Sequence, residues 1–115
     1  MANDFSIINI EEGRPTADVA IKRLASEIVR AKAQNIKVVK LIHGYGSSGV
    51  GGILKTVIRR ELERMKKRGT IKLYVPGENF EIFNIDAIKL LDSSSSIKND
   101  KDLGRYNSGI TMVLL

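Results

Sequence analysis

Apolar and polar positions along this chain follow two different periods. Apolar side chains recur every three to four residues in two long stretches, as they do in helices that bury one face. Shorter apolar runs bounded by glycine, proline or asparagine are typical of strands. The pattern predicts helices at about 17–34 and between Gly52 and Gly69, and strands at 5–10, 37–42, 70–75 and 110–114.

Capping residues define the ends of the two helices. Thr16 is predicted to cap the first helix, and Asp18 in the first turn complements the positive end of the helix dipole. Asn35 stands where the residue after a helix often adopts the left-handed conformation, and Gly69 has the same place after the second helix. Both helices therefore have local stop signals.

The predicted order of elements is β-α-β-α-β-β. Strand–helix alternation implies right-handed crossovers and a mostly parallel sheet, and we expect the last strand to pair antiparallel with the third. The fold class is therefore α/β, an α+β two-layer arrangement with a mixed four-stranded sheet and two main helices. We expect residues 1–115 to form a single domain with a long insert at about 77–108, which covers an open edge or face of the core and includes a short helix around 85–91.

Composition excludes several classes of site. The chain has 115 residues and no cysteine, which removes disulfides, thiolate zinc sites, iron–sulfur clusters and cysteine nucleophiles. His43 is the single histidine, so a multi-histidine metal site is impossible, and the residues require no cofactor. With no signal peptide or membrane span predicted, we expect a cytoplasmic domain with no membrane partner.

Positive charge is concentrated in the middle of the chain. The formal net charge is +6, yet residues 21–40 and 55–68 each carry a net charge of +5, and the rest of the chain is negative. One interpretation is a face for a polyanion such as DNA or RNA. The other is that both segments are the solvated faces of ordinary helices.

The most distinctive feature is a glycine-rich turn. Five of the ten glycines lie within residues 44–52, between a buried strand and a helix, where free N–H groups and the helix dipole favour a phosphate. Ser47 and Ser48 add hydroxyl donors, and His43 is expected at the mouth, where one of its ring nitrogens is able to donate to a phosphate or to accept a proton. The predicted phosphate-binding residues are His43, Gly44, Tyr45, Gly46, Ser47, Ser48, Gly49, Gly51, Gly52, Lys55 and Arg59.

Two nucleotide motifs share part of this spacing but fail. A P-loop would need lysine at the position of Val50, and a dinucleotide-binding fold would need more strands than this chain supplies. A long connection with an incidental histidine remains an alternative interpretation of the turn.

The turn resembles that of the Smr (small MutS-related) domain. Residues 41–49 match the family's apolar-His-Gly-x-Gly turn, residues 53–55 match the start of its helix, and residues 109–114 are similar to its closing strand. The resemblance implies a β-α-β-α-β-β domain like the C-terminal domain of translation initiation factor three. It also implies nucleic-acid binding and, in several members, nicking of DNA or cleavage of RNA.

The family's other motif, Leu-Asp-x-His-Gly at the end of the first strand, is altered here. Asn9 replaces its aspartate and Glu11 replaces its histidine. Asparagine cannot act as a base, whereas the Glu11 carboxylate is able to. On this resemblance the catalytic candidates are His43, Glu11 and Asn9.

Three functions are compatible with the sequence. The leading hypothesis is a nucleic-acid-binding Smr-like domain that recognises DNA or RNA by its backbone or structure and has reduced or absent cleavage, with Tyr45 stacking on an unpaired base or packing in the loop. The alternatives are a nicking endonuclease or endoribonuclease that uses His43 with Glu11, and a protein-interaction module whose partner surface is the apolar insert at 80–91.

Overall fold

The fold was analysed in a computed structural model, which describes residues 4–45 and 50–115. The predicted order of the main elements is confirmed, and the short helix expected around 85–91 is present. β3 starts three residues later than predicted, because the backbone N–H of Thr70 still bonds to the Met65 carbonyl and closes the preceding helix. The elements are β1 (Phe5–Asn9), α1 (Ala17–Ala33), β2 (Val38–Ile42), α2 (Val50–Arg68), β3 (Leu73–Pro76), η1 (Gly77–Asn79), α3 (Ile85–Ser93), η2 (Ser95–Asn99) and β4 (Ile110–Leu114).

The four strands form one mixed sheet in the order β1-β2-β4-β3. β1 pairs parallel with β2, while β4 pairs antiparallel with β3, as predicted, and also with β2. The expectation of a mostly parallel sheet is wrong, because two of the three strand pairs are antiparallel. β2 and β3 run in the same direction, and β4 lies between them in the opposite direction. The fold class, α/β with a mixed four-stranded sheet, is confirmed.

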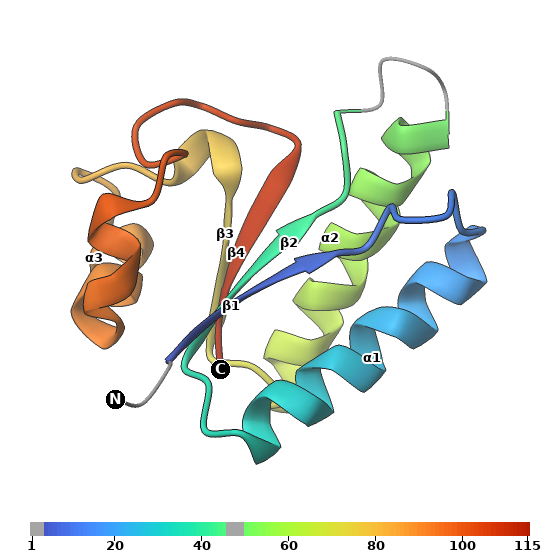
Figure 1. Ribbon diagram of the computed structural model, residues 1–115, viewed down its shortest axis with the longest axis horizontal. Helices are drawn as coiled ribbons and strands as arrows, with labels where there is room; N and C mark the ends of the chain where they lie inside the picture. The colour runs from blue at the N-terminus through green and yellow to red at the C-terminus, as the bar shows by residue number, and fades with distance from the viewer. Residues whose placement is uncertain (1–3, 46–49) are drawn as a thin grey trace.

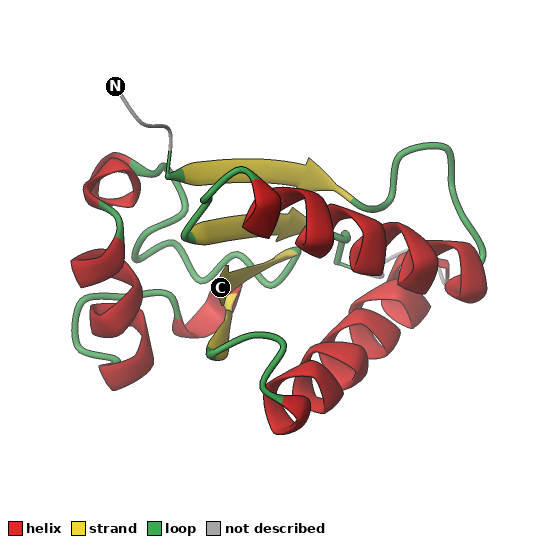
Figure 2. Ribbon diagram, turned by 90° about the horizontal axis from the view of Figure 1, so that it is seen from below, coloured by secondary structure: helices red, strands yellow, loops and turns green. Residues whose placement is uncertain are grey.

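Helices cover both faces of this sheet. α1 and α2 lie together on one face, and α3 lies on the other (Figures 1 and 2). The side chains of β2 alternate accordingly, since Val39 and Leu41 belong to the core on the α1 and α2 side and Val38 to the core on the α3 side. The insert therefore adds a third layer to the expected two.

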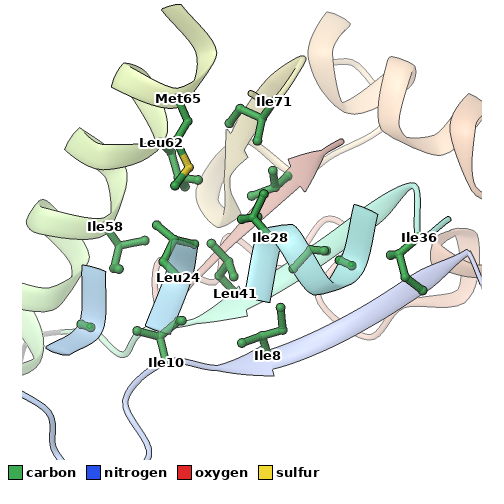
Figure 3. Close-up of a cluster of buried hydrophobic side chains, with 14 of the residues drawn as sticks. Ile8, Ile10, Leu24, Ile28, Ile36, Leu41, Ile58, Leu62, Met65 and Ile71 are labelled. Atoms are coloured by element: carbon green, nitrogen blue, oxygen red, sulfur yellow. The ribbon is translucent and has the colours of Figure 1, made fainter. Parts of the chain in front are cut away.

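The larger core is built by the helical periods seen in the sequence. Leu24 and Ile28 of α1 and Ile58 and Leu62 of α2 point inward toward Leu41 of β2 (Figure 3). All five side chains are almost completely buried. Each contributes about 1.5–3 kcal/mol of hydrophobic stabilisation, so this cluster fixes the two helices against the sheet.

The predicted helix caps are confirmed. The Thr16 hydroxyl accepts a hydrogen bond from the N–H of Val19 at 3.3 Å. Asn35 has φ 59° and Gly69 has φ 80°, both in the left-handed region that ends a helix.

The insert is only partly a cover for the core. Phe80 is 1% exposed and packs with Ala87, Leu90 and Ile97 on the α3 side. Other apolar side chains of the insert are exposed, among them Ile82, Phe83 and Ile85.

Candidate functional site

One edge of the sheet gathers the chain segments that carry the predicted site. Asn9 at the end of β1 is in register with Ile42 at the end of β2, and Ile42 is in register with Ile110 at the start of β4. Residues 43–45 leave the sheet at this edge and lead toward α2 (Figure 1). The altered first motif and the glycine-rich turn therefore do meet, as the resemblance implies.

Part of the predicted site cannot be placed. Gly46, Ser47, Ser48 and Gly49 lie outside the described residues, while Gly51 and Gly52 belong to the first turn of α2. The placed members of the predicted set are His43, Gly44, Tyr45, Lys55 and Arg59, together with Glu11 and Asn9.

His43 is completely buried, with an exposed fraction of 0%. Its Nδ1 lies 3.0 Å from the Gly44 carbonyl oxygen, and its Nε2 lies 2.8 Å from the Thr111 hydroxyl. A carbonyl only accepts, so Nδ1 carries the proton, and in the neutral ring Nε2 accepts from Thr111. The expectation of a ring nitrogen open at the mouth is wrong, because the Gly44 carbonyl of the turn and the Thr111 hydroxyl of β4 occupy the two nitrogens.

The surroundings of His43 keep its ring neutral. The pKa of His43 is lowered to about 4, chiefly by burial, and the hydrogen bond to Gly44 compensates only in part. The positive charges of Arg59 and Lys55 contribute to the same lowering. At neutral pH the ring therefore acts as a fixed hydrogen-bonding bridge between the turn and β4.

Arg59 is also held inside the protein. Its guanidinium forms a two-pronged ion pair with Glu78, at 2.7 and 3.1 Å, and its Nε donates to the Thr111 hydroxyl at 3.0 Å. A further bond of 3.1 Å reaches the Ile110 carbonyl. The hydrogen bond from Arg59, against the opposing effect of burial, lowers the pKa of Glu78. The predicted phosphate contact of Arg59 competes with these partners.

Lys55 is less constrained than Arg59. Its Nζ is 3.8 Å from the Glu78 carboxylate, longer than a hydrogen bond, and its side chain is 27% exposed. It stands one turn inside α2, a helix that has no acidic residue in its first turn. Lys55 is therefore the placed cation best able to meet an anion at this helix end.

Glu11 lies directly against the glycine-rich turn. Gly44 has φ 85°, and a Cβ built there would collide with the Glu11 carboxylate. The Asn9 side chain accepts a hydrogen bond from the N–H of Glu11 at 3.1 Å, so Asn9 shapes this bend. Arg23 supports it from α1 by donating to the carbonyls of Ile10 and Glu12, both at 2.8 Å.

Tyr45 covers the segment that leads into β4. A Cβ at Gly109 would approach the Tyr45 ring to 3.1 Å, so the ring lies over this glycine, and the Tyr45 side chain is still 62% exposed. The N–H groups of His43 and Gly44 both donate to the Gly109 carbonyl at 3.0 Å. An exposed aromatic face thus stands beside the turn.

The basic surface is smaller than the charge count suggests. Lys40, counted in the first basic segment, is 2% exposed and faces the α3 side, where it forms ion pairs with Asp100 and Asp102. Arg23 and Arg59 are engaged as described. The exposed positive charge remains on α1 and α2, for example at Lys22, Arg60, Lys66 and Lys67.

Among the residues that the structure describes, no cluster of three or more histidine or carboxylate side chains could bind a metal ion. A search of the same residues finds no helix long and apolar enough to cross a membrane. A cavity of about 550 Å³ lies at the opposite end of the sheet, and its lining includes Lys32, Lys37, Lys72 and Leu114.

A comparison with protein families finds a Smr domain at residues 14–78, which is more than half of the chain. The chain belongs to the Smr family. The Smr match runs from the entry of α1 through the His43 turn and α2 to η1, and leaves Asn9, Glu11 and β4 outside. No curated protein and no solved structure gives a significant match. Smr membership supports a nucleic-acid-binding or nuclease-like role in general terms.

Two residues of the candidate site were missed from sequence. Thr111 is the one hydroxyl residue within the apolar run of β4, and a polar side chain in a buried strand is a usable signal of a specific partner. Glu78 follows the Pro-Gly stop of β3 and offered no signal of its own. Its role becomes visible only through the ion pair with Arg59.

Proposed function

We propose that this Smr domain binds DNA or RNA through the phosphate backbone, with the contact centred on the first turn of α2 and the exposed face of Tyr45. The helix end offers N–H donors and a positive dipole, and it carries no acidic residue to oppose an anion. Lys55 adds a partly exposed ammonium group one turn further along. The glycine-rich turn and the helix end then hold one phosphate together.

The observation that carries this proposal is the combination of a cationic helix end with an exposed aromatic ring at one edge of the sheet. Tyr45 is available for stacking on an unpaired base, while Lys55 provides charge without base selectivity. Neighbouring phosphates reach the exposed basic residues of α1 and α2. Recognition is therefore directed to backbone and strand conformation rather than to sequence.

His43 has a supporting role in this proposal. Its ring is buried and both ring nitrogens are occupied, so it orders the turn that meets the phosphate. A general acid or base must reach the proton that it transfers, directly or through one water. The contacts of His43 favour binding over His43-driven cleavage.

Fluorescence anisotropy with labelled single-stranded DNA, branched DNA and stem-loop RNA at low salt tests the proposal. The affinity should fall steeply with salt, and Lys55→Gln should weaken binding and reduce the salt slope by about one. Lys98→Gln, on the α3 side of the sheet, is the matched control and should leave both quantities unchanged. Absence of binding to all three probes would refute the proposal, and an effect of Lys98→Gln equal to that of Lys55→Gln would refute its location.

One observation favours cleavage as a second candidate function. The Glu11 carboxylate lies against Gly44, so a phosphate held by the glycine-rich turn would lie near this carboxylate. A nicking endonuclease or endoribonuclease would then use Glu11 as its base, and His43 would act by holding the turn. Incubation of the same labelled probes with the wild type, Glu11→Gln and His43→Ala decides this, since cleavage that survives Glu11→Gln contradicts the assignment.

A further inference from the structure

Lys40 forms a buried charge cluster on the face of the sheet opposite α1 and α2. It stands in the middle of β2, and its side chain is only 3% exposed. Its Nζ lies 2.9 Å from an Asp100 oxygen and also contacts Asp102, while the N–H of Asp102 donates to Asp100 at 2.9 Å. A lysine in a sheet interior requires such partners. The cluster therefore ties the segment after η2 to the centre of the sheet.

Asn107 links this charge cluster by hydrogen bonds to the edge of the sheet that holds the candidate site. Its side-chain Nδ2 donates to Asp102 at 2.9 Å, and its Oδ1 accepts from the N–H of Gly109 at 2.9 Å. The Gly109 carbonyl in turn accepts from the N–H groups of His43 and Gly44. A continuous path of hydrogen bonds thus joins the buried lysine cluster to the glycine-rich turn.

The position of Asn107 is fixed from a second side by packing. A Cβ at Gly77 would collide with the Asn107 backbone carbonyl, so the start of η1 lies in direct contact with it. Both ends of the Asn107 amide are also committed, one to a carboxylate that only accepts and one to an N–H that only donates. The amide has one orientation that satisfies both partners, and aspartate cannot replace it without losing the donor.

We propose that Asn107 is a positioning residue for the nucleic-acid site, and that Asp102 and Lys40 hold it in place. The insert then supports the site, because it fixes the position of Gly109 under the Tyr45 ring and the orientation of the Gly44 backbone. The inference rests on the proposed function for its effect on binding. Its effect on the turn itself is independent of any ligand.

Amide hydrogen exchange and probe affinity test this together. Asn107→Asp keeps the acceptor for Gly109 but places a second carboxylate against Asp102. We expect exchange at the amides of His43 and Gly44 to accelerate by about tenfold, the size of one lost hydrogen bond, and affinity to fall by a similar factor. Amides in the middle of α1, such as Ile28, should be unchanged, which separates a local effect from a general loss of stability.

A rescue variant and a matched control complete the experiment. The double variant Asp102→Asn with Asn107→Asp restores a donor facing a carboxylate and leaves Asp100 to pair with Lys40, so it should recover most of the affinity. Asn99→Ala, an exposed asparagine of η2, should change nothing. Unchanged exchange at His43 and Gly44 in Asn107→Asp, or no recovery in the double variant, would overturn the inference. Wild-type protein that binds none of the probes would overturn the proposed function, while the exchange rates would still decide the positioning role.

Discussion

His43 should make the stability of this protein depend on pH in a defined window. The pKa of the ring is 6.5 in the unfolded chain and about 4 in the folded protein, chiefly because burial disfavours the charged form. Between these values the unfolded chain binds a proton that the folded protein does not, so stability falls as the pH falls. Above the unfolded pKa this contribution is complete, and it is lost on acidification through the window down to the folded pKa.

The magnitude follows from the two pKa values. Each pH unit within the window corresponds to about 1.4 kcal/mol, so the whole change is about 3 kcal/mol. Domains of this size are stable by only about 5–15 kcal/mol, so the effect is large enough to measure.

Urea unfolding of the wild type and His43→Gln at several pH values isolates the effect. Glutamine does not titrate, so the difference between the two free energies of unfolding removes the contribution of the carboxylates. We expect the free energy of unfolding of the wild type, relative to that of His43→Gln, to fall by about 3 kcal/mol between neutral pH and about pH 4. Because His43 is the single histidine, its ring signal in NMR reports the same titration directly. A midpoint near 6.5, or two stability curves that stay parallel, would refute the buried neutral ring.

Three further tests of the geometry use urea unfolding. Gly44→Ala should destabilise more than Gly13→Ala, since both residues have a left-handed φ, which costs alanine about 1–2 kcal/mol, but only Gly44 faces the Glu11 carboxylate. Adding Glu11→Ala to each glycine variant should reduce the difference in destabilisation between Gly44→Ala and Gly13→Ala. Equal destabilisation by the two glycine substitutions would contradict the contact between Gly44 and Glu11. Arg59→Lys should cost about 1–2 kcal/mol because lysine lacks the planar fork that grips Glu78, and a neutral effect would argue against that ion pair. Leu62→Ala should cost about 2–5 kcal/mol, and a smaller loss would mean that the α2 core relaxes into the cavity.

Local signals made much of the fold predictable. Thr16, Asn35 and Gly69 act on residues within a turn or two of themselves, so helix ends could be predicted without knowledge of the rest of the chain. The order of strands depends on contacts between distant segments. The apolar pattern of β4 identifies a buried strand, but it is the same whether that strand pairs with one neighbour or with two.

The candidate site divides in the same way. The glycine-rich turn led to the candidate site at this edge of the sheet, because glycines after a buried strand are a local feature of the sequence. The partners that bury the ring of His43 and retain Arg59 lie far along the chain, Thr111 being 68 residues from His43 and Glu78 being 19 residues from Arg59. Charge counting does not distinguish an arginine held in an internal ion pair from a free one, so the sequence predicts a phosphate contact for Arg59 and not its ion pair with Glu78.

The central place of β4 has a consequence for how the protein is made. On the ribosome, β1, α1, β2 and α2 emerge first and are able to dock on one another, but β3 has no strand to pair with until β4 enters between β2 and β3. Gly109 and Thr111, which receive the turn and the ring of His43, are synthesised with that same strand. A nascent chain whose β4 is still inside the ribosome therefore has β1 and β2 with their helices but an incomplete sheet. The edge proposed to bind nucleic acid is therefore complete only once β4 has joined the sheet.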